Sequence, residues 1–152
     1  MNYRMVFSMI GRLLLLEAAL LLVAAETTGM IRTQLEEALS YTRYLLGQEV
    51  LEQPIVCKAL GGMDEKQIRE RSHRPQDFYG KPHFMPEPED GPAIAALNRA
   101  RCAARAAELQ GVDTFSDRDG CPTRPDIVQA LNRMSSMLYI LMIREKARQG
   151  RK

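Results

Sequence analysis

The amino-acid sequence predicts an all-α protein, folded as a helical bundle of about five helices. Three observations predict this fold class. The apolar residues of the long segments recur every three or four positions, which is the spacing of one helix face. Aromatic residues make up 6% of the chain and Trp is absent, whereas the chain has 9 Met, a composition typical of a helical interior. No stretch of useful length alternates between apolar and polar residues, as a half-buried strand would.

The overall composition limits the class of protein. A chain of 152 residues with 45% apolar and 26% charged residues is typical of a globular protein, so we expect one domain over residues 1–152. The net charge of +2 is too small for a nucleic-acid-binding surface, and we expect no nucleic acid as a partner. The cysteines are Cys57, Cys102 and Cys121. Their wide spacing argues against a disulfide framework or a structural zinc site and favours the reducing cytosol.

Residues 9–26 form the first predicted helix, and their leucine-rich run raises the question of a membrane segment. The apolar run from Leu13 to Ala25 has 13 residues and contains Glu17. A membrane-spanning helix needs about 20 apolar residues, and a charge near its middle costs on the order of 3 kcal/mol. We therefore expect a buried core helix and no membrane contact, with a membrane or secretory segment as the alternative.

Two further helices are predicted before the middle of the chain. Residues 29–48 carry an apolar stripe at helical spacing, with Thr42 as its one polar member and Gly47 as the expected end of the helix. A short helix over 64–71 follows the next turn. Asp64 is its expected N-cap, because a carboxylate oxygen accepts hydrogen bonds from the first free amides of a helix.

The segment 72–92 is predicted to be a loop with a role in function. Its five prolines exclude a long helix. It also carries histidine and aromatic side chains, namely His73, Phe78, Tyr79, His83 and Phe84. A loop of this length is usually either functional or disordered, and the aromatic residues argue against disorder.

Two long helices complete the expected bundle. The fourth covers about 92–109, since Pro92 suits a first helical position. After another loop, the fifth covers about 125–149 and buries a stripe of leucine, isoleucine and methionine. We expect the basic tail, 144–152, to fray into solvent.

Polar residues gather on one face of each of these two helices. On the fourth helix they are Asn98, Arg101, Arg105 and Glu108; on the fifth they are Asn132, Ser135, Ser136 and Tyr139. One interpretation is a solvated helix face and hydrogen bonds between helices. The other is a polar pocket in which guanidinium groups grip phosphate oxygens and an asparagine amide binds the ligand.

Other kinds of site find little support in the sequence. The two histidines lie ten residues apart with no cysteine nearby, which is weak evidence for a metal, and we expect no metal ligands. The chain has no P-loop and no Gly-x-Gly-x-x-Gly motif. It also shows no Ser–His–Asp set for nucleophilic catalysis.

Several segments resemble a known family. The stretch "RPDIVQALNRMSSMLYILMI" is similar to the last helix of the ethanolamine-utilisation (EutT) type of cobalamin adenosyltransferase, also called corrinoid adenosyltransferase. The stretches "QPIVCKALGGMDEKQIRERSH" and "SHRPQDFYGKPHFMPEPEDGPAIAALNRARCAARAAEL" also resemble that family, so the resemblance covers about residues 32–145. The wider family has an Arg-x3-Arg-x2-Glu helix followed by a Leu-Asn-Arg-x-Ser helix. The matching residues are Arg101, Arg105, Glu108, Leu131, Asn132, Arg133 and Ser135.

The resemblance implies a function and a set of site residues. The implied reaction transfers the 5′-deoxyadenosyl group of ATP to cob(I)alamin, in an oligomer of helical bundles with active sites between subunits. The residues implied for ATP binding are Arg101, Arg105, Glu108, Asn132 and Arg133, of which Arg105 and Arg101 would be catalytic. The residues implied for corrinoid binding are Phe78, His83 and Phe84, with Phe78 or Phe84 as the wedge that displaces the lower axial ligand.

The resemblance also implies cofactors, partners and a location. ATP would bind with Mg²⁺, and the second substrate would be cob(I)alamin or cob(II)alamin. Expected partners are further copies of the chain and a reductase or an adenosylcobalamin-dependent lyase. The expected location is the cytoplasm, in association with a bacterial microcompartment.

The sequence departs from the family pattern at its N-terminal side. The His- and Cys-rich metal motif of the ethanolamine type is absent from this sequence, as is the Gly-Asp-x-Gly-x-Thr phosphate loop of the wider family. The segment "GRLLLLEAALLLVAAE" resembles a family helix whose acidic position falls on Leu14. The alternative function is therefore a catalytically impaired fragment or paralogue that binds corrinoid or nucleotide, or serves in oligomerisation.

Overall fold

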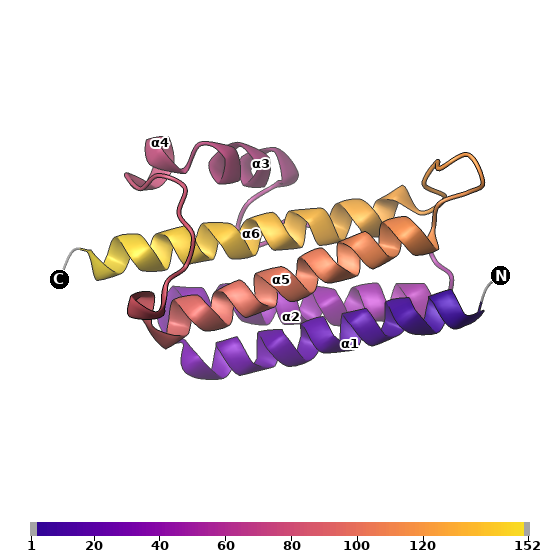
Figure 1. Cartoon of the computed structure of the whole chain (residues 1–152), viewed down its shortest axis with the longest axis horizontal. Coiled ribbons are helices and arrows are strands. Elements are labelled where there is room, and N and C mark those ends of the chain that lie inside the picture. Colours follow the sequence, from indigo (N-terminus) through magenta and orange to yellow (C-terminus); the bar gives the residue numbers. More distant parts are fainter. Residues whose placement is uncertain (1–2, 151–152) are drawn as a thin grey trace.

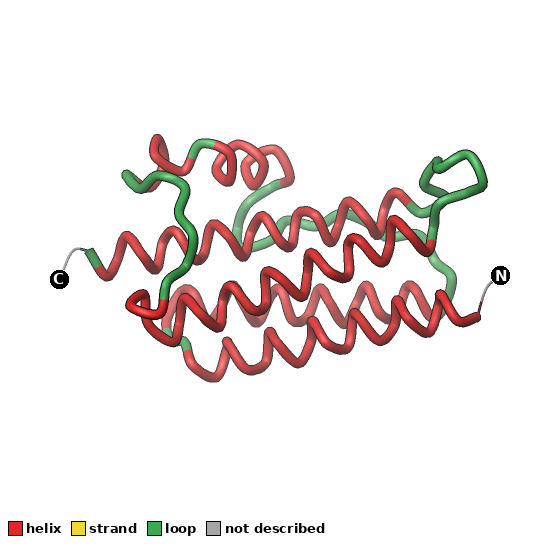
Figure 2. The backbone as a smooth tube through the Cα atoms, viewed as in Figure 1, coloured by secondary structure: helices red, strands yellow, loops and turns green. Residues whose placement is uncertain are grey.

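The computed structural model describes residues 3–150, and the side chains of residues 7–150. Four long helices lie side by side, and shorter helices cover one side of them (Figure 1). The helices are α1 (Tyr3–Glu26), α2 (Gly29–Val50), α3 (Glu65–His73), α4 (Pro75–Tyr79), α5 (Gly91–Thr114) and α6 (Pro125–Gln149), with a 3-10 turn at Pro88–Asp90. Within residues 3–150 there is no strand, so the predicted all-α fold is confirmed (Figure 2).

The core forms where α1 and α6 pack on the small residues of α5. The alanines of α5 that face inward, Ala100, Ala104 and Ala107, are fully buried. Because these side chains are short, the neighbouring helices approach closely and fill the space with leucine and methionine. The fully buried side chains of α1 and α6 include Met9, Leu13, Leu16, Leu20, Leu131, Met134 and Leu138. Burying each such side chain contributes about 1.5–3 kcal/mol.

Helix α1 is a core helix on one side only. Its inner side packs on α5 and α2, and Glu17 pairs with Arg43 of α2 at 2.7 Å. Its outer side exposes large apolar residues, namely Phe7, Leu14, Leu15, Leu21 and Leu22. By length and composition alone, Phe7–Glu26 would also suffice to cross a membrane, but a core helix passes the same test. The prediction of a buried core helix is thus confirmed for its inner side.

Several predicted helix bounds were wrong. Helix α1 begins at Tyr3 instead of about 9, α3 ends at His73 instead of about 71, and α4 lies within the predicted loop 72–92. Two further helix ends differ because tertiary contacts extend the helix. Helix α2 continues past Gly47 to Val50 and buries Glu49. Helix α5 runs to Thr114 instead of about 109, because Gly111 packs against Met9 and Val128.

The prediction of a frayed basic tail was also wrong where the structure describes it, since residues 144–149 belong to α6. Arg144 donates to Gln34 of α2 at 2.8 Å, and Lys146 pairs with Asp90. Arg148 donates to Glu145 at 2.6 and 2.9 Å. Residues 151–152 of the predicted tail lie outside the described part of the chain.

The proline-rich segment is ordered by short helices and by its contacts with α6. The predicted short helix is present as α3, and Asp64 caps it by accepting a hydrogen bond from the Gln67 amide at 2.7 Å. Pro75 begins α4, and Gly80 ends it in the left-handed conformation at φ +64°. The chain then crosses over α6 on its way to α5 (Figure 1). This path brings the loop predicted to be functional onto the two helices that carry the predicted polar faces.

Candidate functional site

The predicted polar faces of α5 and α6 meet in the structure. Helix α5 and helix α6 pack against each other over most of their length (Figure 1). Glu108 of α5 contacts Asn132 of α6, and Arg101 of α5 lies over Tyr139 of α6. Arg101 and Glu108 are seven residues, or two turns, apart on α5, and Asn132 and Tyr139 are seven residues apart on α6. The two contacts therefore lie on the same face of each helix. The site therefore has two parts that are joined along α5.

The first part is a cluster of Arg105, Glu108 and Asn132. Glu108 Oε1 accepts from Arg105 Nη1 at 2.5 Å and from Asn132 Nδ2 at 3.0 Å. The Glu108 side chain is 8% exposed, whereas that of Arg105 is 51% exposed. A buried carboxylate thus holds an exposed guanidinium in one orientation, which is the arrangement needed to present a cation to an anionic ligand.

The cluster contains one polar atom without a partner. Glu108 Oε2 is buried and accepts no hydrogen bond from any described residue. An unsatisfied buried acceptor typically costs about 1–3 kcal/mol, and native proteins carry few of them. A ligand hydroxyl or amine, or a water molecule, would satisfy this oxygen if it entered the cluster.

The second part is an aromatic pocket beside the cluster. It has a volume of about 410 Å³, and its lining comes from the proline-rich loop, α5 and α6: His83, Phe84, Met85, Pro86, Arg101, Tyr139 and Met142. The Tyr139 ring stacks on those of His83 and Phe84, at centroid distances of 5.7 and 6.4 Å. The pocket is mostly apolar and carries one guanidinium, so it suits a large flat ligand with a polar edge.

An ion pair borders this aromatic pocket. The ammonium group of Lys146 lies 5.7 Å from the centroid of the Phe84 ring and pairs with Asp90. The hydrogen bonds from Lys146 and from the Glu87 amide lower the pKa of Asp90 below its ordinary value. The Asp90 carboxylate is therefore charged at neutral pH, and its pair with Lys146 joins the loop to the end of α6.

Arg101 belongs to the aromatic pocket and precedes the cluster on the same helix. Its Nε donates to Asn98 Oδ1 at 3.1 Å, and its guanidinium carbon lies 6.0 Å from the centroid of the Tyr139 ring. It lines the aromatic pocket and lies one helical turn before Arg105. Arg101 and Arg105 can therefore contact one ligand that spans pocket and cluster.

Two predicted site residues lie elsewhere. Arg133 faces α3, where its Nε donates to Glu65 Oε1 at 3.2 Å. Phe78 of α4 lies under Arg71, whose guanidinium carbon is 5.5 Å from the ring centroid, and Phe78 does not line the pocket. The structure thus brings together Arg105, Glu108 and Asn132, and separately His83 and Phe84 with Arg101, but it does not add Arg133 or Phe78.

The structure adds pocket residues that the sequence did not single out. They are Met85, Pro86 and Met142. Tyr139 was grouped with Asn132 on one face of the helix by its spacing of two turns, and it lines the pocket. No local signal marked Met85 or Pro86, since their position depends on how the loop crosses α6.

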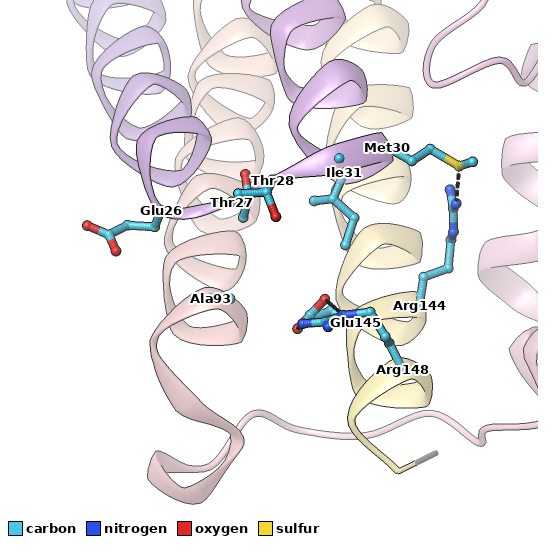
Figure 3. A pocket seen from close by; sticks show the side chains of 10 residues that line it. Glu26, Thr27, Thr28, Met30, Ile31, Ala93, Arg144, Glu145 and Arg148 are labelled. Carbon is cyan, nitrogen blue, oxygen red and sulfur yellow. Dashed lines mark hydrogen bonds and ion pairs between the residues drawn. The ribbon is translucent and has the colours of Figure 1, made fainter. Parts of the chain in front are cut away.

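A larger cavity lies at a different place in the bundle. It measures about 450 Å³ and is lined by the turn between α1 and α2 and by α6 residues that include Arg144, Glu145 and Arg148 (Figure 3). Arg144 donates there to Gln34 Oε1 and to the Met30 sulfur, each at 2.8 Å. None of the predicted site residues lines this cavity.

The described residues offer no cluster of metal ligands. Over residues 3–150, no group of three or more His, Cys, Asp or Glu side chains is placed to hold a metal ion.

Comparison with known proteins identifies the family. The sequence profile described as cobalamin adenosyltransferase matches residues 4–145. The protein named Corrinoid adenosyltransferase EutT from Escherichia coli (strain K12) is 34% identical over 99 residues, which are 65% of this chain and 37% of the relative. Its namesake from Salmonella typhimurium (strain LT2) is 32% identical over 99 residues, again 65% of this chain and 37% of the relative.

The matched stretch thus spans well under half the length of these curated relatives. No solved structure matches the chain at a significant level. The family profile nevertheless covers nearly all of the described residues, including the whole α5–α6 site. The chain therefore belongs to the cobalamin adenosyltransferase family.

Proposed function

We propose that the protein is an ATP:cob(I)alamin adenosyltransferase that makes adenosylcobalamin for ethanolamine utilisation. The observation that carries this proposal is the position of Arg101, which lines an aromatic pocket one helical turn before Arg105 in a cluster of arginine, carboxylate and amide side chains. In this proposal the corrin ring lies against the aromatic lining of the pocket, and the triphosphate binds the arginines. The reaction needs these two ligands side by side.

The proposed chemistry is a displacement at the 5′ carbon of ATP. The Co(I) electron pair forms the Co–C bond, the C5′–O bond breaks, and the triphosphate leaves with the bonding electrons. Cobalt is thereby oxidised from Co(I) to Co(III). Because the corrinoid is supplied as Co(II), an external one-electron reductant must first convert it to Co(I). The protein contributes positioning and charge stabilisation rather than proton transfer.

Each residue of the cluster has a proposed role toward ATP. Arg105 and Arg101 bind the triphosphate and stabilise the charge that develops on it as it leaves. Glu108 holds Arg105 and, through its unpaired Oε2, accepts a hydrogen bond from a nucleotide hydroxyl or amine. Asn132 positions the nucleotide beside Glu108, and Mg²⁺ would be bound by the phosphates.

Arg133 supports the ATP site indirectly. Its ion pair with Glu65 joins α6 to α3, and its neighbour Asn132 lies on the same turn of α6. A direct contact between Arg133 and ATP would require that this ion pair open.

The aromatic pocket is the proposed corrinoid site. Phe84 is the favoured wedge under the corrin ring, because it lines the pocket while Phe78 does not. His83 shapes the same wall of the pocket. Phe78 would reach a corrinoid only if a neighbouring subunit or a loop movement brought the two together.

The outer side of α1 supports a homo-oligomer. Its exposed residues Phe7, Leu14 and Leu21 repeat every seven positions, which is the repeat of a helix-packing seam. Monomeric soluble proteins rarely expose apolar patches of this kind. We propose that a second copy covers this surface and that residues from both copies complete the active site.

Introducing an aspartate at the centre of this surface tests whether α1 forms the interface of the oligomer. In Leu15→Asp, the new carboxylate would be desolvated at the interface, so we expect the oligomer to dissociate to monomers in light-scattering chromatography while helix content is kept. Val56→Asp is the matched control, because Val56 is a similarly exposed apolar residue in the loop before α3. An unchanged assembly in Leu15→Asp would show that α1 does not form the interface.

The activity itself is tested by anaerobic spectroscopy. Purified protein is mixed with cob(II)alamin, a reductant and MgATP, and formation of adenosylcobalamin is followed by absorbance. We expect product and free triphosphate in equal amounts, with no product when ATP is omitted. A protein that binds neither substrate and forms no product would contradict the proposal.

A second function is favoured by one observation. The phosphate loop of the wider family is absent from this sequence, so the chain could bind corrinoid or nucleotide without turnover. Binding of cob(II)alamin without adenosylation under the same conditions would support this function. For either function we propose a cytoplasmic location with a microcompartment, and a reductase or an adenosylcobalamin-dependent lyase as a protein partner.

A further inference from the structure

Both ring nitrogens of His83 are engaged in hydrogen bonds. His83 Nε2 lies 3.2 Å from the carbonyl oxygen of His73, and His83 Nδ1 lies 3.0 Å from the Tyr139 hydroxyl. A carbonyl oxygen only accepts hydrogen bonds, so Nε2 carries the proton of the neutral ring. Nδ1 is then the acceptor, and the Tyr139 hydroxyl donates to it.

The Tyr139 hydroxyl also holds the neighbouring residue of the loop. Its oxygen accepts a hydrogen bond from the Phe84 amide at 3.2 Å. The Tyr139 and His83 rings stack nearly parallel, with an interplanar angle of 8°. One hydroxyl therefore orders both loop residues of the aromatic pocket, and each donor in this network meets one acceptor.

We propose that Tyr139 is a positioning residue that keeps His83 from coordinating the cobalt of a bound corrinoid. The inference rests on the proposed function, because it concerns the same pocket. A neutral imidazole is the commonest nitrogen ligand for metals in proteins, and His83 lines the proposed corrin site beside Phe84. While Tyr139 occupies the Nδ1 lone pair and the His73 carbonyl accepts from Nε2–H, His83 has no electron pair to offer to cobalt.

This blockade has a consequence for the reduction of Co(II). An axial nitrogen donor stabilises Co(II) relative to Co(I), because the added electron occupies the cobalt orbital directed at the axial ligand. A pocket that presents the Phe84 ring and withholds the His83 nitrogen therefore eases the reduction that must precede transfer. Tyr139 acts through His83 and Phe84 and needs no contact with cobalt itself.

The substitution Tyr139→Phe isolates the role of the hydroxyl. It keeps an aromatic ring to stack on His83 and Phe84, but it frees the Nδ1 lone pair and leaves the Phe84 amide without its acceptor. Tyr44→Phe is the matched control. It also removes a tyrosine hydroxyl that accepts from a backbone amide, that of Val56 at 3.0 Å, in a loop away from the pocket.

The first measurement uses the protein without corrinoid. The chain has only 2 His, so nitrogen NMR of ¹⁵N-histidine protein resolves His83 by comparison with His83→Ala. At pH 8, where an ordinary imidazole is neutral, we expect protonated Nε2 and hydrogen-bonded Nδ1 in His83. Tyr139→Phe should shift the Nδ1 signal and Tyr44→Phe should not. A proton on Nδ1, or an unchanged Nδ1 signal in Tyr139→Phe, would overturn the proposal.

The second measurement uses cob(II)inamide, which carries no nucleotide base of its own. We expect its electron paramagnetic resonance spectrum in the wild-type protein to change on binding and to lack nitrogen splitting. In Tyr139→Phe we expect three-line nitrogen splitting, which becomes two-line with ¹⁵N-histidine and disappears in the double variant Tyr139→Phe/His83→Ala. Nitrogen splitting in the wild type, or none in Tyr139→Phe, would overturn the proposal.

Turnover gives a third measurement. We expect Tyr139→Phe to form adenosylcobalamin about tenfold more slowly, the rate equivalent of one lost hydrogen bond, with partial recovery when His83→Ala is added. An equal loss of rate in Tyr139→Phe and in Tyr139→Phe/His83→Ala would show a merely structural role of the hydroxyl and would overturn the proposal. If cob(II)inamide and cob(II)alamin do not bind the wild type, the proposed function fails, and the role of Tyr139 toward cobalt fails with it. A bound corrinoid with no effect of Tyr139→Phe would instead refute only the inference.

Discussion

Replacing Arg105 by Ala is expected to lower the rate of adenosylcobalamin formation by about 10²–10³-fold, the usual effect of removing one transition-state charge partner. Arg105 is half-exposed and is oriented by the buried Glu108, so its charge is available to the leaving triphosphate. The loss should appear mainly in kcat, because the triphosphate gains charge as it leaves. Anaerobic steady-state kinetics with varied ATP would measure both kcat and KM.

Two variants control for other causes of that loss. Arg99→Ala removes another exposed arginine of α5 from a different helix face, and we expect activity within about twofold of the wild type. Arg105→Lys keeps a charge but not the two-pronged geometry, and should recover only part of the rate. Wild-type kcat in Arg105→Ala would show that this cluster does not bind the leaving group.

Replacing Arg124 by Ala is expected to cost about 2–4 kcal/mol of unfolding free energy at neutral pH. Arg124 donates to Asp126 at 3.0 and 3.3 Å and pairs with Glu49 at 3.4 Å, joining the start of α6 to the end of α2. The Glu49 side chain is 3% exposed, so the variant leaves a buried carboxylate without its cation. Urea unfolding followed by circular dichroism would measure the loss.

The two carboxylates predict how that loss varies with pH. Burial raises the pKa of Glu49 despite Arg124, so its charge opposes folding at neutral pH, and this opposition is relieved as the pH falls through the raised pKa. Burial alone would raise the pKa of Asp126, but hydrogen bonds from Arg124 and the Ile55 amide outweigh it and lower that pKa. The stabilisation by Asp126 is therefore present above its unfolded pKa and is lost as the pH falls through the folded value.

Both effects make the difference in unfolding free energy between the wild type and Arg124→Ala smaller at acid pH. In the variant, Glu49 takes up its proton at a higher pH, and Asp126 no longer loses a bond to Arg124 when it protonates. We expect the deficit to be largest at neutral pH and clearly smaller at about pH 4.5, near the ordinary carboxylate range. Arg32→Ala breaks an exposed pair with Glu36, should cost under about 1 kcal/mol, and controls for charge removal. A deficit that does not change with pH would show that Arg124 stabilises through packing alone.

Much of the fold was predictable because its signals are local. Helical spacing of apolar residues predicted the long helices, and Asp64 before a short helix predicted its cap, since both depend on neighbours in sequence. The ends of α2 and α5 were misjudged, because burial of Glu49 and packing of Gly111 on Met9 are contacts with distant segments. Helical propensity depends on residues that are close in sequence, so it does not predict such contacts.

The candidate site shows the same division between local and distant causes. The sequence by itself determined which residues share a helix face, so helical spacing alone grouped Arg101, Arg105 and Glu108, and its motifs indicated the family. Only the tertiary structure decided that Asn132 faces Glu108, that Arg133 is directed away to Glu65, and that Tyr139 meets His83. The physical reason is that helical periodicity orders side chains along one helix. Which faces meet, and where a proline-rich loop lands, depends on how whole helices pack around a shared core.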